Sequence, residues 1–294
     1  MIDTATTHFQ TRRSQLLSLA YQMLGELAAA EDIVQEAWLR WNKTDHDDIR
    51  SPDAWLTSVV TRLSIDQLRS ARNRRESYTG TWLPEPIVEK TDGPAGLLEL
   101  AQNCELALLW ALERLSEEER AAFLLRKVFD TDYVDIAAVL ERSEDACRQL
   151  VSRAGRAVQD QTPKYLSSPA QLEEMMLKFV IAAAAGDKQA VLELLAPDVV
   201  AVSDGGGVVR AALIPLEGAD KVAQVMTHIA SKGHRERGKG ALPELARVNG
   251  RPAFVQMGGT EQDMIFTLRL NEAGQICWIY TLRNPVKLAL VSAR

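Results

Sequence analysis

The sequence has few cysteines, few aromatic residues and no long apolar run. Cys104, Cys147 and Cys277 are odd in number and widely spaced, and no Cys/His spacing typical of a metal site occurs. We therefore expect three reduced cysteines packed as small apolar residues, with no metal and no other cofactor. The longest apolar stretch, residues 179–185, is far shorter than the roughly 18 residues of a membrane helix. The N-terminal residues have no apolar core typical of a secretory signal, so we expect a cytoplasmic protein that does not bind a membrane.

Charge is distributed unevenly along this chain. Its 294 residues include 34 basic and 40 acidic side chains, and the net charge of −6 argues against a protein that coats nucleic acid. Because salt screens fields beyond about 8–10 Å, local clusters matter more than the sum. Two arginine clusters lie on segments with helical spacing. They are Arg62, Arg69, Arg72, Arg74 and Arg75, and then Arg142, Arg148, Arg153 and Arg156.

Two stretches, the first 75 or so residues and residues 97–158, have the apolar periodicity of α-helices. Ser51 precedes Pro52 as a helix start, and Ser116 with Glu119 forms a capping box. Between them, residues 76–96 contain several prolines and glycines, which predict a linker. The linker also carries Trp82, an aromatic side chain that a featureless tether would not need. Two helical units joined by an ordered linker are therefore expected.

Residues 130–158 have the pattern of a helix-turn-helix, whose second helix would lie in the DNA major groove. The predicted outer face of that helix is rich in Arg and Gln, which pair with guanine and adenine edges. Two amphipathic helices of an ordinary bundle would show the same periodicity, so this pattern alone leaves both interpretations open. The same holds for the basic helix before the linker, which suits phosphates and unstacked bases but could be a solvated face. Residues 30–41 likewise suit either a docking helix or a core helix.

After Pro163 the pattern changes to one helix followed by strands. Ser168-Pro169 opens the helix and Gly186 ends it. Strand-like runs follow at 199–202, 208–214, 265–270 and 276–282, and Asn249-Gly250 predicts a type I′ hairpin turn. The predicted fold class is thus multi-domain, with two all-α helical domains followed by an α+β domain.

Several segments together resemble extracytoplasmic-function sigma factors. Residues 16–41 and 51–76 are similar to the sigma-2 domain, and residues 112–158 are similar to the helix-turn-helix sigma-4 domain. The linker sequence Trp-Leu-Pro-Glu-Pro at 82–86, Asp-Gly-Gly-Gly at 204–207 and Asn-Pro-Val-Lys-Leu at 284–288 resemble the subgroup with a fused SnoaL-like (NTF2-like) cone domain. The resemblance implies a sigma-2 domain at 1–76, a linker at 77–103, a sigma-4 domain at 104–162 and a SnoaL-like regulatory domain at 168–290.

The resemblance also implies an alternative sigma factor that directs promoter recognition and transcription initiation, with its activity modulated by the C-terminal domain. Its partners would be promoter DNA and the beta-prime clamp and beta flap of the RNA polymerase core. The implied polymerase contacts are Asp32, Gln35, Glu36, Trp38, Leu39 and Trp41. The implied contacts to the −10 element are Trp55, Arg62, Arg69, Arg72, Arg74 and Arg75.

The implied contacts to the −35 element are Ser143, Glu144, Asp145, Arg148, Gln149, Ser152, Arg153 and Arg156. The C-terminal domain would make intramolecular contact with the sigma domains. The implied regulatory contacts are Trp82, Leu83, Pro84, Glu85, Pro86, Asp204, Gly205, Gly206, Gly207, Asn284, Pro285 and Lys287.

The sequence departs from the subgroup pattern at three places. Val208 stands where a basic residue usually follows the glycines, and Val286 where an acidic residue is usual. Gly155 stands where relatives often carry Arg in the reading helix. A mid-helix glycine costs about 1 kcal/mol relative to alanine and supplies no phosphate contact, so we expect weaker −35 binding.

Two other functions remain open for this sequence. One is a helix-turn-helix regulator that binds DNA without polymerase, with a ligand-sensing or enzymatic NTF2-like domain. The other is an enzyme whose catalytic unit is the C-terminal domain, with the helical part regulating it. Catalysis there would need an acid or base in an apolar pocket. The candidates are Asp204, His228, His234, Glu261 and Asp263, and no two of them form a recognisable pair by spacing. We therefore expect a regulatory surface and no enzymatic activity, with Asp204 and the glycines forming a tight turn.

Overall fold

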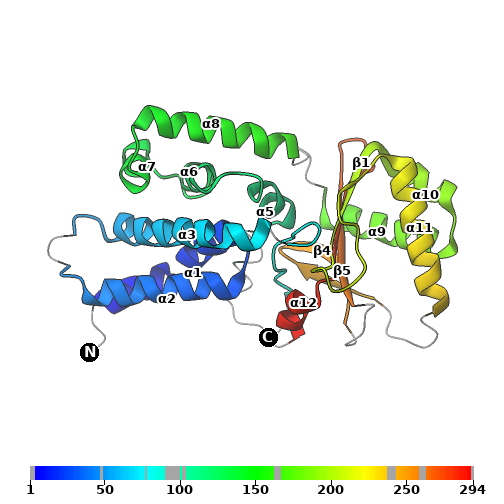
Figure 1. Cartoon of the computed structure of the whole chain (residues 1–294), viewed down its shortest axis with the longest axis horizontal. Helices are drawn as coiled ribbons and strands as arrows, with labels where there is room; N and C mark the ends of the chain where they lie inside the picture. The colour runs from blue at the N-terminus through cyan, green and yellow to red at the C-terminus, as the bar shows by residue number, and fades with distance from the viewer. Residues whose placement is uncertain are drawn as a thin grey trace. The chain divides into compact units, whose positions relative to one another are not determined.

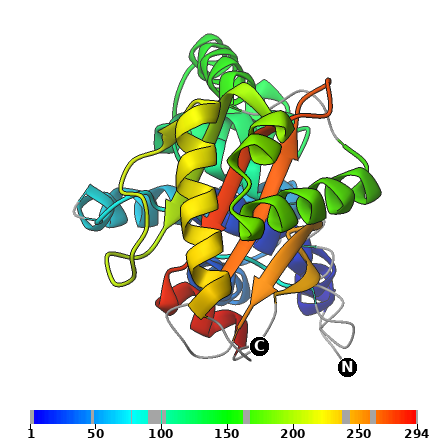
Figure 2. The same cartoon turned by 90° about the vertical axis from the view of Figure 1, so that its right-hand side faces the viewer.

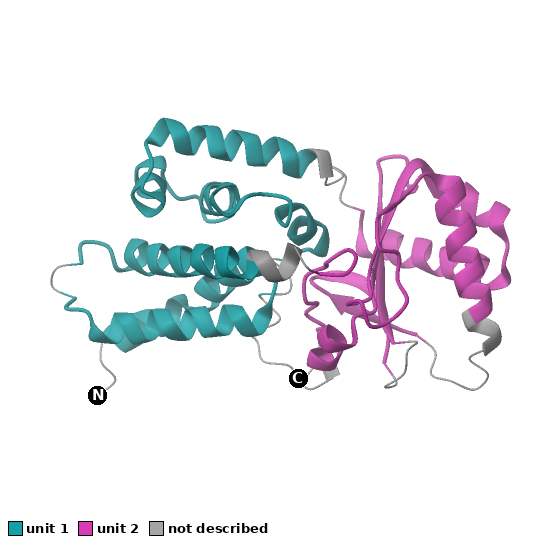
Figure 3. Cartoon of the chain, in the orientation of Figure 1, with its two compact units in different colours: residues 1–76, 92–162 teal, residues 77–91, 163–294 magenta. Residues whose placement is uncertain are grey.

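The computed structural model describes residues 4–46, 49–76, 78–89, 100, 104–161, 167–236, 243–257 and 263–292. The chain forms two compact units (Figure 3). One contains Met1–Glu76 and Asp92–Thr162, and the other contains Ser77–Thr91 and Pro163–Arg294. The first part of the linker therefore belongs to the C-terminal unit. Among the described residues no helix is both long and apolar enough to cross a bilayer.

The first unit is built from helices (Figure 1). They are α1 (Thr4–Leu24), α2 (Leu27–Lys43), α3 (Pro52–Glu76), α5 (Leu106–Leu112), α6 (Glu117–Lys127), α7 (Tyr133–Leu140) and α8 (Glu144–Gln161). Ser116 makes the expected capping box at the start of α6, where its side chain accepts from the Glu119 amide and Glu119 reaches back. At the start of α8, the Ser143 hydroxyl accepts from the Ala146 amide at 3.2 Å. Serine caps thus fix both helix starts, the first of them where the sequence predicted it.

The helix-turn-helix comprises α7 and α8. Glu141 ends α7 in the left-handed conformation, with a φ of 55°. Beyond this turn, α8 buries Leu150, Val151 and Ala154 and leaves its other side exposed. The apolar stripe that the sequence predicted is therefore the face by which α8 packs within its unit.

The C-terminal unit combines helices with one mixed sheet. Its helices are α9 (Pro169–Ala185), α10 (Lys188–Leu194), α11 (Ala219–Glu236) and α12 (Pro285–Ser292). Its strands are β1 (Leu195–Asp204), β2 (Leu216–Glu217), β3 (Glu244–Val248), β4 (Arg251–Gln256), β5 (Met264–Leu270) and β6 (Ile276–Leu282). The strand order is β2-β1-β6-β5-β4-β3, with β1 and β6 parallel and the other neighbours antiparallel.

One face of the sheet packs against helices and forms the core. Figure 2 shows α9, α10 and α11 in front of the strands. Phe266, Leu268 and Leu270 of β5 all enter this core, as their alternation predicted, and Phe266 stacks on Phe179 of α9 at 5.7 Å between ring centroids. Asn249 and Gly250 form the predicted hairpin turn between β3 and β4, with φ of 49° and 75°.

One predicted strand does not form. Residues 208–214 were expected to be extended in a sheet, but they are turn and irregular backbone. Val208, Leu213 and Ile214 are all more than 60% exposed, so these β-branched and apolar side chains have no core to pack on. The preceding glycines turn the chain away from the sheet, and β1 pairs instead with Leu216–Glu217.

Candidate nucleic-acid interface and linker clamp

The outward face of α2 carries most of the predicted polymerase contacts. Asp32 and Gln35 are exposed, and the Leu39 side chain is 44% exposed although it is apolar. Glu36 pairs with Arg40 one turn later at 2.8 Å. Trp38 is only half-buried and lies 5.0 Å from the Phe9 ring. These side chains form a mixed apolar and acidic surface one helix wide.

Trp41 does not belong to this surface. Its side chain is 2% exposed, its Nε1 donates to the Ala5 carbonyl at 2.9 Å, and its ring lies 5.4 Å from that of Trp55. A side chain so buried offers no surface to a partner. The grouping of Trp41 with the polymerase contacts is therefore corrected, and this ring is a core residue that joins α1, α2 and α3.

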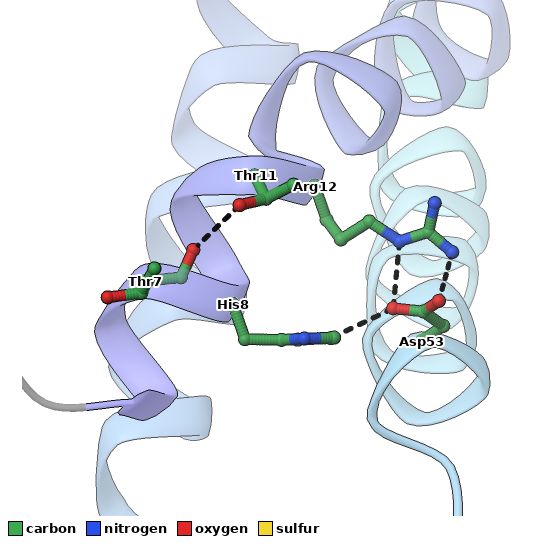
Figure 4. Close-up of a pocket in the computed structure, with 5 residues that line it drawn as sticks. All are labelled: Thr7, His8, Thr11, Arg12 and Asp53. Carbon is green, nitrogen blue, oxygen red and sulfur yellow. Dashed lines mark hydrogen bonds and ion pairs between the residues drawn. The ribbon is translucent and has the colours of Figure 1, made fainter.

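The start of α3 is fastened to α1 by a polar cluster (Figure 4). The Asp53 carboxylate accepts from Arg12 Nε at 2.7 Å and from a second guanidinium nitrogen, and it lies 2.8 Å from His8 Nε2. The Arg12 guanidinium beside it, through hydrogen bonding first, holds the pKa of Asp53 below its usual range. With Thr7 and Thr11, these residues line a pocket of about 450 Å³. Both carboxylate oxygens are thus engaged in positioning α3.

Two arginines of the predicted −10 helix contact the helix-turn-helix module of the same unit. Arg62 donates to the carbonyls of Ala138 and Val139 at 2.9 and 3.1 Å, at the C-terminal end of α7. Arg69 pairs with Glu118 of α6 at 3.2 Å, and Glu118 also pairs with Arg142 at 3.1 Å. In this conformation both arginines are therefore bound to protein. The side chains of Arg72, Arg74 and Arg75 lie outside the described residues.

The outer face of α8 is exposed and carries the predicted −35 residues. Arg148 pairs with Glu144 at 2.9 Å, and Arg153 pairs with Glu119 of α6 at 3.2 Å. Glu144 is half-buried, and the other members of the set are exposed: the capping residue Ser143, Asp145, Arg148, Gln149, Ser152, Arg153 and Arg156. The structure thus places these polar and charged side chains on one continuous helical face.

A buried ion pair fastens the linker to the C-terminal domain. Lys287 Nζ lies 2.8 Å from Asp204 Oδ2, and the two side chains are 8% and 0% exposed. The same carboxylate oxygen accepts from the Leu83 amide at 2.9 Å, and Lys287 Nζ donates to the Leu83 carbonyl. The ammonium also lies 4.0 Å from the centroid of the Trp82 ring. Both main-chain polar groups of Leu83 are therefore bound by one charge pair.

Tyr78 and Asn284 complete this contact. The Tyr78 hydroxyl donates to Asp204 Oδ1 at 2.6 Å and accepts from Asn284 Nδ2 at 2.7 Å. Burial, followed by the Asp204 carboxylate, holds the pKa of Tyr78 above its usual range, so the hydroxyl remains a neutral donor. Tyr78, like Trp82, is an aromatic residue of the linker. We name the set Tyr78, Leu83, Asp204, Asn284 and Lys287 the linker clamp.

The glycines after Asp204 let the chain pass close to the clamp. Gly206 has a φ of 67°, and a Cβ there would lie 2.7 Å from the Asn284 side chain. Gly207 has a φ of 71°, and a Cβ there would lie 3.0 Å from Thr79 of the linker. Asp204 Oδ1 accepts from the Gly206 amide at 2.9 Å. The expected tight turn is thus present, and side chains at these positions would displace the linker or Asn284.

Residues 87–89, farther along the described part of the linker, are held by the β3–β4 hairpin. The Ile87 amide donates to Asn249 Oδ1 and the Asn249 amide donates to the Ile87 carbonyl, both at 2.9 Å. Val88 forms an antiparallel bridge with Val248, and Glu89 pairs with Arg247 at 3.3 Å. These contacts were missed by the sequence reasoning, which read Asn249 only as a turn residue. Residues 78–89 are therefore tied to the domain at both ends.

A helix-turn-helix, the arginine-bearing helix α3 and a linker segment held by an α+β domain together point to a protein of the sigma class. Two family models match the chain, Sigma-70 region 2 over residues 8–74 and Sigma-70 region 4 over residues 105–157. The chain is 38% identical to the ECF RNA polymerase sigma factor SigJ of Mycobacterium tuberculosis, over 96% of this chain and 92% of that protein. It is 32% identical to the probable ECF RNA polymerase sigma factor SigI of the same species, over 97% and 95%.

The crystal structure of M. tuberculosis SigJ superposes with a TM-score of 0.76 at 35% identity, and the match covers 96% of this chain and 98% of that one. The chain belongs to the extracytoplasmic-function family of RNA polymerase sigma factors. The predicted fold class is thereby confirmed, including the C-terminal helix-plus-sheet domain. Promoter recognition and transcription initiation follow as its function, and nothing favours a polymerase-independent regulator.

Proposed function

We propose that the exposed face of α2 binds the beta-prime clamp of RNA polymerase, while the module of α5–α8 binds the beta flap. Asp32, Gln35 and Leu39 support the first contact, because an exposed apolar side chain beside charges is typical of an interface centre. On promoter DNA, α3 captures the −10 element and α8 reads the −35 element.

The C-terminal domain regulates the factor by fixing the length and path of the linker between the two DNA-reading modules. The observation that carries this proposal is the Asp204–Lys287 pair, which binds both main-chain polar groups of Leu83. A linker segment held at residues 78–83 and again at residues 87–89 cannot extend freely, so the domain limits the distances and orientations that the flanking modules adopt.

Binding to polymerase releases the −10 arginines. Arg62 and Arg69 are occupied by α7 carbonyls and by Glu118, so they must leave these partners before they can contact DNA. The Arg69–Glu118 pair is partly exposed, and surface ion pairs contribute only about 0–1 kcal/mol each, so polymerase and promoter can displace it.

The C-terminal domain acts in this scheme without chemistry of its own, and the protein works in the cytoplasm. Asp204, the best-placed of the candidate acids, is fully buried and engaged by Tyr78, Leu83, Gly206 and Lys287. His228 is exposed on α11, whereas an acid–base catalyst of this fold would stand in an apolar pocket. A carboxylate bound by four donors serves to hold the linker.

Association with core polymerase tests this proposal directly. The purified chain should bind core polymerase and direct transcripts from a cognate promoter, while binding that promoter poorly by itself. Equal promoter affinity with and without polymerase would instead support the helix-turn-helix regulator. Turnover of a small molecule by the chain would contradict the non-enzymatic role of the C-terminal domain.

Arg148→Ala should remove one base-specific contact. An arginine that binds a guanine edge contributes about 1–3 kcal/mol of discrimination at that base pair. Affinities of the holoenzyme for promoters altered at single −35 positions would show the loss at one position. A uniform loss across all sequences would make Arg148 a phosphate contact.

Gly155→Arg should strengthen −35 binding. A Cβ at Gly155 meets nothing within 4 Å, so larger side chains fit on this half-exposed side of α8. The new charge should steepen the salt dependence of promoter binding by roughly one counterion. Gly155→Ala is the matched control, because it should stabilise the helix by about 1 kcal/mol without that change in salt slope. Equal salt slopes for the two variants would exclude a phosphate contact at this position.

A further inference from the structure

The ring of Tyr133 is a meeting point of α6, α7 and α8. Tyr133 is the first residue of α7 and is half-buried. The guanidinium carbon of Arg148 from α8 lies over this ring, 4.7 Å from its centroid, and that of Arg126 from α6 lies 5.3 Å from it. A guanidinium lying over an aromatic face is attracted by the ring, and this attraction restricts the orientation of the guanidinium plane.

Arg148 is also held along its edge. One terminal nitrogen donates to Glu144 Oε2 at 2.9 Å, and the other lies 3.4 Å from Asp145 Oδ1. The Arg148 side chain remains 48% exposed. Because each terminal nitrogen of arginine carries two N–H groups, a second donor on each remains for another partner. The Tyr133 ring and the two acidic side chains of α8 together restrict the Arg148 side chain, which would otherwise sample many rotamers.

This restriction matters because guanine is read by two parallel hydrogen bonds from one planar guanidinium to O6 and N7. The plane must match that of the base, and the entropy of fixing a long side chain opposes binding unless the side chain is fixed beforehand. Arg153, by contrast, is held by an ion pair with Glu119 of α6. Among the arginines of the reading face, Arg148 combines an aromatic support with two acidic neighbours.

We propose that Tyr133 is a positioning residue for promoter readout, which sets the plane of the Arg148 guanidinium against a guanine of the −35 element. This inference rests on the proposed base contact of Arg148. Tyr133 lies on the helix that precedes the reading helix, so it determines specificity without touching a base. Arg126 supports the ring from α6 and is itself held by Asp130 at 3.1 Å and by the Thr131 carbonyl at 3.2 Å.

The test measures holoenzyme affinity for a set of promoter duplexes in which each −35 base pair is changed in turn. The variants of the full chain are Arg148→Ala, Tyr133→Leu, Tyr133→Met and Tyr133→Phe. Val134→Ala is the matched control, because Val134 is the next residue of α7 and is 63% exposed. Thermal unfolding of each variant separates lost readout from lost folding.

Arg148→Ala should flatten the preference at one base pair by about tenfold or more. Tyr133→Leu and Tyr133→Met should flatten the preference at the same base pair severalfold and leave other positions unchanged. Tyr133→Phe keeps the aromatic face and should restore the preference, while Val134→Ala should not alter it. In the Arg148→Ala background, Tyr133→Leu should have no further effect on base preference.

Each of the other outcomes contradicts either the positioning role of Tyr133 or the base contact of Arg148. If Arg148→Ala flattens one position but both apolar Tyr133 variants leave every preference intact, the positioning role is wrong and the reading role of α8 stands. A uniform weakening by folded Tyr133 variants at all positions also overturns the positioning role. If Arg148→Ala changes no preference, the base contact itself is wrong, and this inference falls with it.

Discussion

Lys287→Met is expected to destabilise the linker clamp by about 3 kcal/mol, because removal of one partner leaves a buried charge unpaired. Methionine keeps most of the apolar stem of lysine, so the substitution mainly removes the ammonium group. Asp204 retains the Tyr78, Leu83 and Gly206 donors, so the destabilisation should lie at the lower end of the range for breaking a buried ion pair. Amide exchange in residues 78–89 should speed up by about 100-fold, at roughly 1.4 kcal/mol per factor of ten.

Val286→Ala is the matched control for this prediction. Val286 precedes Lys287 in α12 and is 68% exposed, so its truncation should leave linker exchange within error. The double variant with Asp204→Asn removes both charges and should cost less than the sum of the two single changes. Unchanged exchange in Lys287→Met would show that the ion pair does not hold the linker.

Trp41→Ala is expected to destabilise the helical unit by about 3–5 kcal/mol. The substitution opens a large cavity among α1, α2 and α3. It also removes the hydrogen bond from Nε1 to the Ala5 carbonyl and the contact with the Trp55 ring. Because Trp55 stands on the −10 helix, loss of promoter melting should accompany loss of stability. Thermal unfolding followed by far-ultraviolet circular dichroism measures the first effect.

Leu39→Ala, on the same helix, should show the opposite pattern. Leu39 is 44% exposed, so its truncation should change stability by less than about 0.5 kcal/mol. If it lies at the centre of the polymerase contact, affinity for core polymerase should fall by more than about 1 kcal/mol. A stable Trp41→Ala protein with weakened polymerase binding would reverse these two assignments.

Most of the fold could be predicted from residues that are neighbours in the sequence. The serine at 116 and the glutamate three residues later specify a helix start, because the capping interactions involve only neighbours. Asn249 and Gly250 specify the hairpin turn for the same reason. The periodicity of α2 also indicated that Trp41 is buried, since Leu27, Val34 and Trp41 recur every seven residues on its buried face.

Long-range partners could not be obtained in this way. Lys287 meets Asp204 across 83 positions, and Leu83 meets Asp204 across 121. The motifs at 82–86, 204–207 and 284–288 were marked by resemblance, but the bonds that join them depend on the completed fold. Residues 208–214 do not form the predicted strand, because β propensity reflects packing on a half-buried surface and no sheet face is available to these side chains.

The measurement that tests the account most directly is run-off transcription by core polymerase from promoters whose −35 to −10 spacing is changed in single base pairs. Each added base pair rotates one element against the other by roughly 35°, so a clamped linker should favour a narrow range of spacings. The full chain should give transcripts with a sharp optimum, and a chain ending at Pro163 should give a broader one, with Lys287→Met between them. Identical spacing profiles for the full and shortened chains would contradict the claim that the C-terminal domain sets the linker.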